Sequence, residues 1–203
     1  TTRAAELVAQ GAIGEVVQTL GLGPHRLNAA TRPDWFFETA RYGGILTDIA
    51  SHQIDQFLYF TGATDAEVTF AEVANTHHAQ WPGLQDFGKV SLRAGRACGY
   101  DRVDWFTPDA LPTWGDGRLI LTGTEGTLEI RKYVDVGGAP GGDHLFLVNG
   151  TRCERISGAG AGLPYFARLC ADIRDRTETA MPQAHAFKVM ELAIRAQAMA
   201  DAR

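Results

Sequence analysis

Four polar side chains recur along one otherwise apolar segment, at the spacing of helical turns. Asp48, His52, Asp55 and Tyr59 follow each other at steps of four, three and four residues. In a helix this spacing puts them on one face, about one turn apart. An imidazole exchanges protons near neutral pH, and a carboxylate beside it can fix its tautomer or hold a second hydroxyl. The pattern predicts either acid–base chemistry or a structural pair satisfied by the protein itself.

The segment that carries these residues is predicted to be a helix over residues 44–61. Apolar residues such as Leu46, Ala50 and Ile54 provide a face for burial, and Gly62 suits the helix end. A helix over 3–10, a strand over 15–22 and an aromatic-rich loop over 31–37 precede it. The elements predicted after it are strands over 67–75, 86–94, 97–105, 118–122, 126–131 and 143–148, a glycine-rich linker over 157–162, and helices over 164–176 and from 183 to the end.

The strands follow one another closely, with no helix between them, and short glycine-containing turns separate several of them. Such spacing favours antiparallel pairing, because parallel neighbours need long crossover connections. No internal repeat divides the chain. The sequence therefore predicts one α+β domain over residues 1–203, built on a large, open, predominantly antiparallel sheet.

Composition narrows the function classes. The 203 residues are 45% hydrophobic and 21% charged, which is ordinary for a globular protein, and the net charge of −5 argues against a nucleic-acid binder. No apolar run is long enough for a membrane span, and the first residues lack the apolar core of a signal peptide. Three scattered cysteines fit reduced thiols better than disulfides or a zinc site. We expect a cytoplasmic protein that binds neither nucleic acid nor membrane.

Two features of the sequence limit what chemistry the chain can do alone. It has only three lysines, Lys89, Lys132 and Lys188, and none lies near the 44–61 segment in sequence. It also lacks the glycine-rich turns that hold the phosphates of dinucleotides and nucleoside triphosphates. The glycine-rich stretches at 137–142 and 158–162 lack the strand–turn–helix setting of such sites and are predicted to be plain loops.

Four segments together resemble the C-terminal domain of the Gfo/Idh/MocA oxidoreductases, the family of glucose–fructose oxidoreductase and inositol dehydrogenase. They are residues 11–16 (GAIGEV), 32–35 (RPDW), 43–55 (GGILTDIASHQID) and 123–126 (GTEG). They occur in the family's order over nearly the whole chain. The resemblance implies a sheet with helices on one face. The opposite face would then be available for a homo-oligomer, a dimer or a tetramer.

The resemblance also implies an activity. Members of the family oxidise a hydroxyl of sugars, inositols or related polyols with NAD or NADP, which a separate N-terminal Rossmann domain holds. That domain is missing here, together with a Glu-Lys-Pro segment whose lysine usually completes the active site. By resemblance, His52 is the catalytic acid–base and Asp48 is the carboxylate that binds substrate or orients the site. We do not expect this chain to transfer a hydride by itself.

Further candidates for substrate binding lie around this pair. Arg32 and Trp35 fit the wall of a sugar pocket, through hydrogen bonds and apolar stacking, and a packed loop is an equal alternative. Tyr42 lies just ahead of the 44–61 helix, within reach of the same cleft. For Asp55, an ion pair or a carboxylate on the helix surface is as good an interpretation as contact with a ligand. No metal site is expected from these residues.

A rival hypothesis keeps the fold and removes the catalysis. The chain would then be a non-catalytic carbohydrate-binding or scaffold domain. An upstream dinucleotide-binding fingerprint in the full reading frame would favour the enzyme, and its lack would favour the rival.

Overall fold

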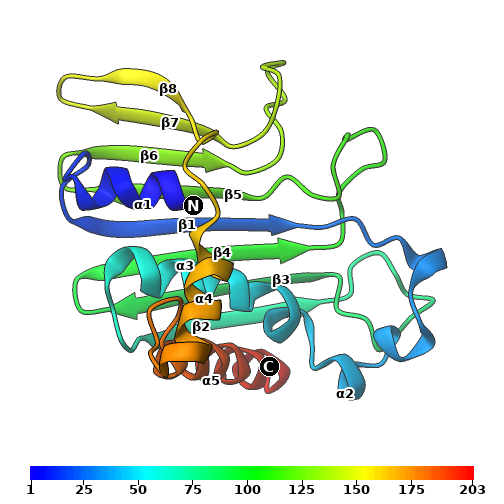
Figure 1. Ribbon diagram of the computed structural model, residues 1–203. Helices are drawn as coiled ribbons and strands as arrows, with labels where there is room; N and C mark the ends of the chain where they lie inside the picture. The colour runs from blue at the N-terminus through cyan, green and yellow to red at the C-terminus, as the bar shows by residue number, and fades with distance from the viewer.

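Eight strands form a single sheet in the order β2-β3-β4-β1-β5-β6-β7-β8, as seen in the computed structural model, which describes residues 1–203 (Figure 1). Every neighbouring pair is antiparallel except β1 and β4. The strands are β1 (Val16–Pro24), β2 (Glu67–Ala74), β3 (Phe87–Ala94), β4 (Ala97–Asp104), β5 (Arg118–Gly123), β6 (Gly126–Arg131), β7 (His144–Asn149) and β8 (Cys153–Ser157). The predicted open, mainly antiparallel sheet is confirmed.

One strand was not predicted from the sequence. The β8 segment, Cys-Glu-Arg-Ile-Ser, is mostly exposed and has two adjacent charged residues, so it lacks the alternation of a half-buried strand. It pairs only with β7 and ends the sheet. Short, charged strands are common at sheet edges, where they discourage pairing with other chains.

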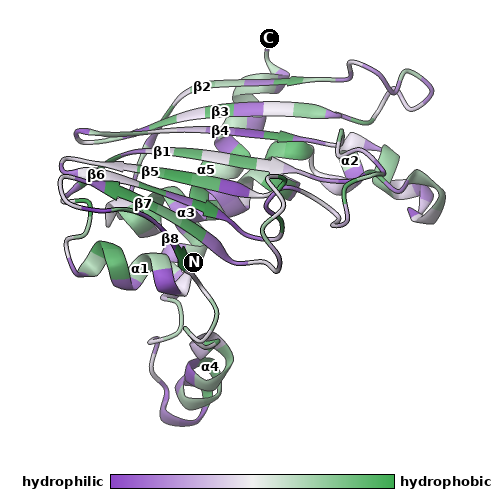
Figure 2. Cartoon of the chain, turned by 90° about the horizontal axis from the view of Figure 1, so that it is seen from above, coloured by the Kyte–Doolittle hydropathy of each residue, from purple (hydrophilic) through white to green (hydrophobic).

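Helices cover one face of the sheet. The helices of the chain are α1 (Thr2–Ala9), α2 (Thr39–Tyr42), α3 (Ser51–Thr61), α4 (Pro164–Asp175) and α5 (Gln183–Asp201), with short turns η1 (Ala29–Thr31), η2 (Asp34–Phe37) and η3 (Leu46–Ala50). Of these, α1, α3 and α5 pack on this face. In Figure 1, α1 lies along the half of the sheet that contains β5 and β6, whereas α3 and α5 lie over the half that contains β1 to β4. Figure 2 shows α4 set apart from the sheet. No helix combines the length and the apolar character that crossing a membrane requires.

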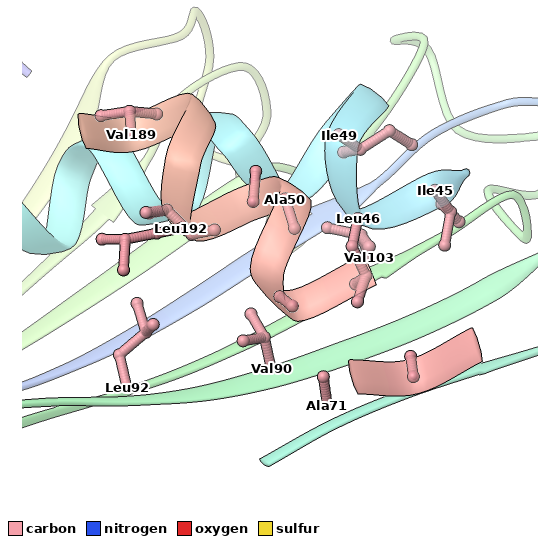
Figure 3. Close-up of a cluster of buried hydrophobic side chains, with 14 of the residues drawn as sticks. Ile45, Leu46, Ile49, Ala50, Ala71, Val90, Leu92, Val103, Val189 and Leu192 are labelled. Carbon is pink, nitrogen blue, oxygen red and sulfur yellow. The ribbon is translucent and has the colours of Figure 1, made fainter. Parts of the chain in front are cut away.

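The core has two parts that match these two halves. The larger part joins η3, α3 and α5 to β2, β3 and β4, and Figure 3 shows Ile49, Leu192 and Val90 among its side chains. The smaller part packs α1 against β5, β6 and β7, and Phe60 of α3 reaches into it. Because α3 contributes to both parts, it is held firmly across the middle of the sheet.

The predicted 44–61 helix is present, with a different start. Its first turn is π-helical over Leu46–Ala50, and regular α-helix follows over Ser51–Thr61. Gly62 ends the helix at a φ of 68°, as predicted. Sequence periodicity does not reveal a single wide turn, and such π-turns occur often at functional sites.

Candidate active site

The start of the π-helical turn is fixed by two glutamines from distant parts of the chain. Gln197 of α5 accepts a hydrogen bond from the backbone N–H of Leu46 (3.1 Å), and Gln85 accepts one from Ile45 (3.0 Å). The two amides are joined to each other at 3.1 Å. Helix starts leave N–H groups unpaired, so these bonds hold the turn that carries Asp48.

Gly44 makes this arrangement possible. Its φ is 89°, and a Cβ added to it would lie only 2.3 Å from the Gln197 amide. Only glycine combines this backbone conformation with so close an approach. Within the Gly43–Gly44 pair, which the resemblance picked out, Gly44 therefore seats Gln197 against the helix start, whereas Gly43 approaches Thr47.

A second pair of glycines lets α3 lie directly on β1. A Cβ on Gly21 or on Gly23 would meet the side chain of Gln53 at 2.8 Å. The absence of side chains at these two positions brings α3 down onto the end of β1. His52, the neighbour of Gln53, is thereby placed beside His25, which follows β1.

His52 lines a cleft of about 280 Å³ at this end of the sheet. The side chain of His52 is exposed and forms no hydrogen bond within the chain, which leaves its ring nitrogens available to a ligand. The cleft is lined by Gly23, Pro24, His25, His52, Gln53, Gln56, Trp114, Gly117, Lys132 and Tyr133. A larger hollow beside α4, of about 360 Å³, contains no histidine.

Asp48 lies within electrostatic reach of His52 and Arg32. Although its side chain is accessible, the surrounding protein removes much of its water, and this burial raises the pKa of the carboxyl group above its usual value. The positive charge of Arg32 and the nearby His52 oppose that rise without cancelling it. The carboxylate accepts no hydrogen bond from the chain, so it can accept one from a substrate hydroxyl.

His25 is a part of the site that sequence reasoning missed. Its Nδ1 lies 2.9 Å from the carbonyl oxygen of Gly23. Because a carbonyl only accepts, Nδ1 must carry the proton, which leaves Nε2 as an acceptor. Burial lowers the pKa of His25, and His52 and Arg32 lower it further against the effects of Gly23 and Asp104. The ring centre of His25 lies 4.3 Å from that of Trp114.

Lys132 is the second residue that sequence reasoning missed. It follows β6, and its backbone is tied to Gly117 and Asp143 by hydrogen bonds of 3.1 Å each. Its side chain enters the cleft that holds His52. Burial lowers the pKa of its ammonium group, and the negative charge of Asp55 opposes this shift. The only sequence signal was its place just after an apolar strand, which many residues share.

The predicted substrate-binding residues fall into different surroundings. Arg32 stacks over Phe36 with its guanidinium carbon 4.3 Å from the ring centre, and its Nε donates to the carbonyl of Leu27. Trp35, on η2, is 42% exposed. Of these two side chains, Arg32 acts electrostatically on Asp48, and neither lines the cleft around His52.

Tyr42 and Asp55 already have partners within the chain. The hydroxyl of Tyr42 accepts the backbone N–H of Gln85 at 2.9 Å, and burial raises the pKa of that hydroxyl to about 12. Asp55 Oδ1 lies 2.6 Å from His185 Nε2 of α5. No group of three or more histidine, cysteine or acidic side chains is arranged to hold a metal ion.

The family follows from comparison with known proteins. The model of the GFO/IDH/MocA C-terminal domain matches residues 1–129, and the chain belongs to this family. No curated protein matches the chain. A crystal structure from Erwinia carotovora atroseptica SCRI1043, assigned as an oxidoreductase, is 51% identical with a TM-score of 0.94, covering 98% of this chain and 60% of that one. The chain therefore spans about three fifths of that relative's length.

Two more distant structures share the fold. One is an aldose-aldose oxidoreductase from Caulobacter crescentus complexed with glycerol, at 18% identity and a TM-score of 0.73, covering 98% of this chain and 58% of that one. The other is a levoglucosan dehydrogenase in complex with NADH, at 18% identity and a TM-score of 0.70. The match covers 98% of this chain and 60% of the dehydrogenase chain. These two likenesses show that the chain shares their fold.

Proposed function

We propose that this chain is the substrate-binding domain of an NAD(P)-dependent oxidoreductase that oxidises a hydroxyl of a sugar, an inositol or a related polyol. The observation that carries the proposal is His52, unengaged by the protein and facing a cleft beside Asp48. Support comes from the levoglucosan dehydrogenase complex with NADH and from the glycerol bound to the aldose-aldose oxidoreductase.

The residues that line the cleft and Asp48, one helical turn before His52, have separate parts in this chemistry. His52 takes the proton of the hydroxyl that becomes a carbonyl, and Asp48 accepts a hydrogen bond from a neighbouring hydroxyl. Trp114 and Tyr133, with ring centres 5.0 Å apart, offer apolar faces to the carbon skeleton. Binding through several such contacts fixes which hydroxyl faces His52.

The hydride acceptor is bound outside this chain. The sequence has no glycine-rich turn between a strand and a helix, so its residues do not fit the phosphates of a dinucleotide. A nicotinamide supplies the acceptor when the full-length protein binds it. In this proposal the fragment alone binds a polyol and does not oxidise it.

A substrate panel tests the proposal. The full-length protein is assayed with NAD⁺ and NADP⁺ against aldoses, inositols and linear polyols, while the absorbance of the reduced nicotinamide is followed. We expect turnover of at least one polyol. Binding of a polyol without turnover by either cofactor would favour the rival, a non-catalytic carbohydrate-binding domain.

We also propose a homo-oligomer, a dimer or a tetramer, that pairs through the open face of the sheet. This face carries apolar side chains such as Tyr100, Ile120 and Val148, of which Tyr100 is 36% and Val148 46% exposed. Sedimentation of the full-length protein should give a dimer or a tetramer at micromolar concentration. Tyr100→Glu combined with Ile120→Lys should shift it toward the monomer, and a monomer in the unmodified protein would contradict the proposal.

A further inference from the structure

The ammonium group of Lys132 enters the cleft without an anionic partner. It forms no ion pair and no hydrogen bond with any side chain, although the other two lysines, Lys89 and Lys188, both form ion pairs. Asp55 acts on Lys132 only electrostatically, by raising its pKa. The Asp55 carboxylate itself is paired with His185. A half-buried cation without a partner loses hydration and gains little in return.

The surroundings of Lys132 are suited to a polyhydroxy ligand with one negative charge. Its side chain shares the cleft with His52 and His25, and the aromatic rings of Trp114 and Tyr133 form another part of the lining. No acidic side chain lines the cleft. Asp48, which lies near His52, interacts with Arg32, so its charge is already partly balanced.

We propose that Lys132 selects substrates by binding a carboxylate, so that the enzyme prefers a polyhydroxy acid, such as an aldonate or a uronate, to the matching neutral polyol. This inference rests on the proposed function, because it names the substrate class of the same cleft. The ammonium group forms a charge-assisted hydrogen bond to the carboxylate. The acid is thereby anchored, and one of its hydroxyl groups faces His52.

A matched pair of ligands tests the inference. D-Gluconate and D-sorbitol share a six-carbon chain and differ at one end, where gluconate has a carboxylate. Binding of each to the full-length protein is measured by calorimetry. We expect gluconate to bind at least about 10-fold more tightly, and Lys132→Met to weaken gluconate by about 10- to 100-fold while changing sorbitol less than about 2-fold.

Two controls separate recognition from folding. Lys132→Arg keeps the positive charge and should retain part of the preference for gluconate. Lys89→Met removes a lysine of β3 that is paired with Glu72, outside the cleft, and should leave both affinities unchanged. Thermal unfolding reports whether each variant is folded, and Lys132→Gln replaces Lys132→Met if the latter unfolds.

The outcomes also separate this inference from the proposed function. Equal binding of the two ligands, no binding of gluconate, or equal losses in Lys132→Met would overturn the carboxylate site. Oxidation of neutral polyols in that case would leave the proposed function standing. Conversely, gluconate binding that depends on Lys132, with no oxidation of gluconate, of a uronate or of any neutral polyol in the presence of NAD⁺ or NADP⁺, would support the site and refute the oxidoreductase.

Discussion

Two histidine–aspartate pairs of this chain consist of the same residue types and differ in their surroundings. His52 lines the cleft and Asp48 lies one helical turn before it, within electrostatic reach, and neither side chain forms a hydrogen bond within the protein. Asp86 and His78 lie in the β2–β3 connection, with His78 Nδ1 2.9 Å from the Asp86 carboxylate. The Asp86 side chain is 0% exposed. The difference teaches that unmet hydrogen-bonding capacity, more than residue type, marks the candidate site.

The Asp86 carboxylate is fully occupied by its own chain. It accepts hydrogen bonds from the backbone N–H groups of Thr76 and His77, from the Thr76 hydroxyl and from His78. Burial alone would raise the pKa of Asp86, but these bonds outweigh it and the pKa is lowered. Such a carboxylate holds a loop together and has little capacity left for a substrate.

The largest expected effect comes from His52→Ala in the full-length enzyme. Removal of a general acid–base should lower kcat by about 10²- to 10⁴-fold. Because the side chain is exposed, the free energy of unfolding should change by less than about 1 kcal/mol. His77→Ala, which removes another exposed histidine, is the matched control for kcat and for thermal unfolding. If His52→Ala lowered both kcat and the free energy of unfolding, His52 would have a structural role like that of His78, and the distinction between the two pairs would be wrong.

Asp86→Ala should show the opposite pattern. The loss of a buried, hydrogen-bonded carboxylate should lower the free energy of unfolding by about 2–4 kcal/mol, while kcat per folded molecule stays within about 2-fold. Since the folded-state pKa is lowered, the stabilisation is present above the unfolded pKa and is lost as pH falls through the folded pKa. Urea unfolding between pH 2 and 7 measures both effects. If Asp86→Ala lowered kcat as much as His52→Ala does, the distinction between a structural pair and a site pair would be contradicted.

A third carboxylate sharpens the comparison, because it is buried and has no partner. Asp101 lies under α3, is 1% exposed, and neither of its oxygens has a hydrogen-bond partner. Burial raises the pKa of Asp101 well above its usual range. Asp101 therefore stays protonated at pH values where it ionises in the unfolded chain.

Asp101→Asn should remove a pH-dependent loss of stability. With a raised folded-state pKa, the free energy of unfolding falls by about 1.4 kcal/mol per pH unit as pH rises from about 4 toward the folded pKa. Asp101→Asn lacks this pH-dependent loss. Its free energy of unfolding should therefore rise relative to that of the unmodified protein as pH increases over this range. Denaturant unfolding at several pH values measures the difference. A variant with an unchanged pH profile would show that Asp101 ionises normally.

Much of the fold could be predicted because its signals are local. Strand alternation, glycine turns and the end of the helix at Gly62 depend on neighbours in sequence. The π-helical turn depends instead on Gln197, which lies about 150 residues away from Leu46. Strand β8 was missed because edge strands need no apolar face.

The candidate site was predictable only where its residues lie on one element. Asp48 and His52 share the 44–61 segment, so their spacing revealed them. His25 and Lys132 follow β1 and β6, and only the pairing of strands brings them to the same cleft. Tyr42 and Asp55 were plausible by position, yet each has a partner inside the chain that spacing could not reveal.

The central claim is that the His52 imidazole moves the substrate proton. Chemical rescue of His52→Ala in the full-length enzyme tests it most directly. The predicted result is a much reduced kcat that rises with added imidazole, whereas imidazole leaves the unmodified enzyme and His77→Ala unchanged. The contradicting result is a folded His52→Ala protein whose kcat equals that of the unmodified enzyme.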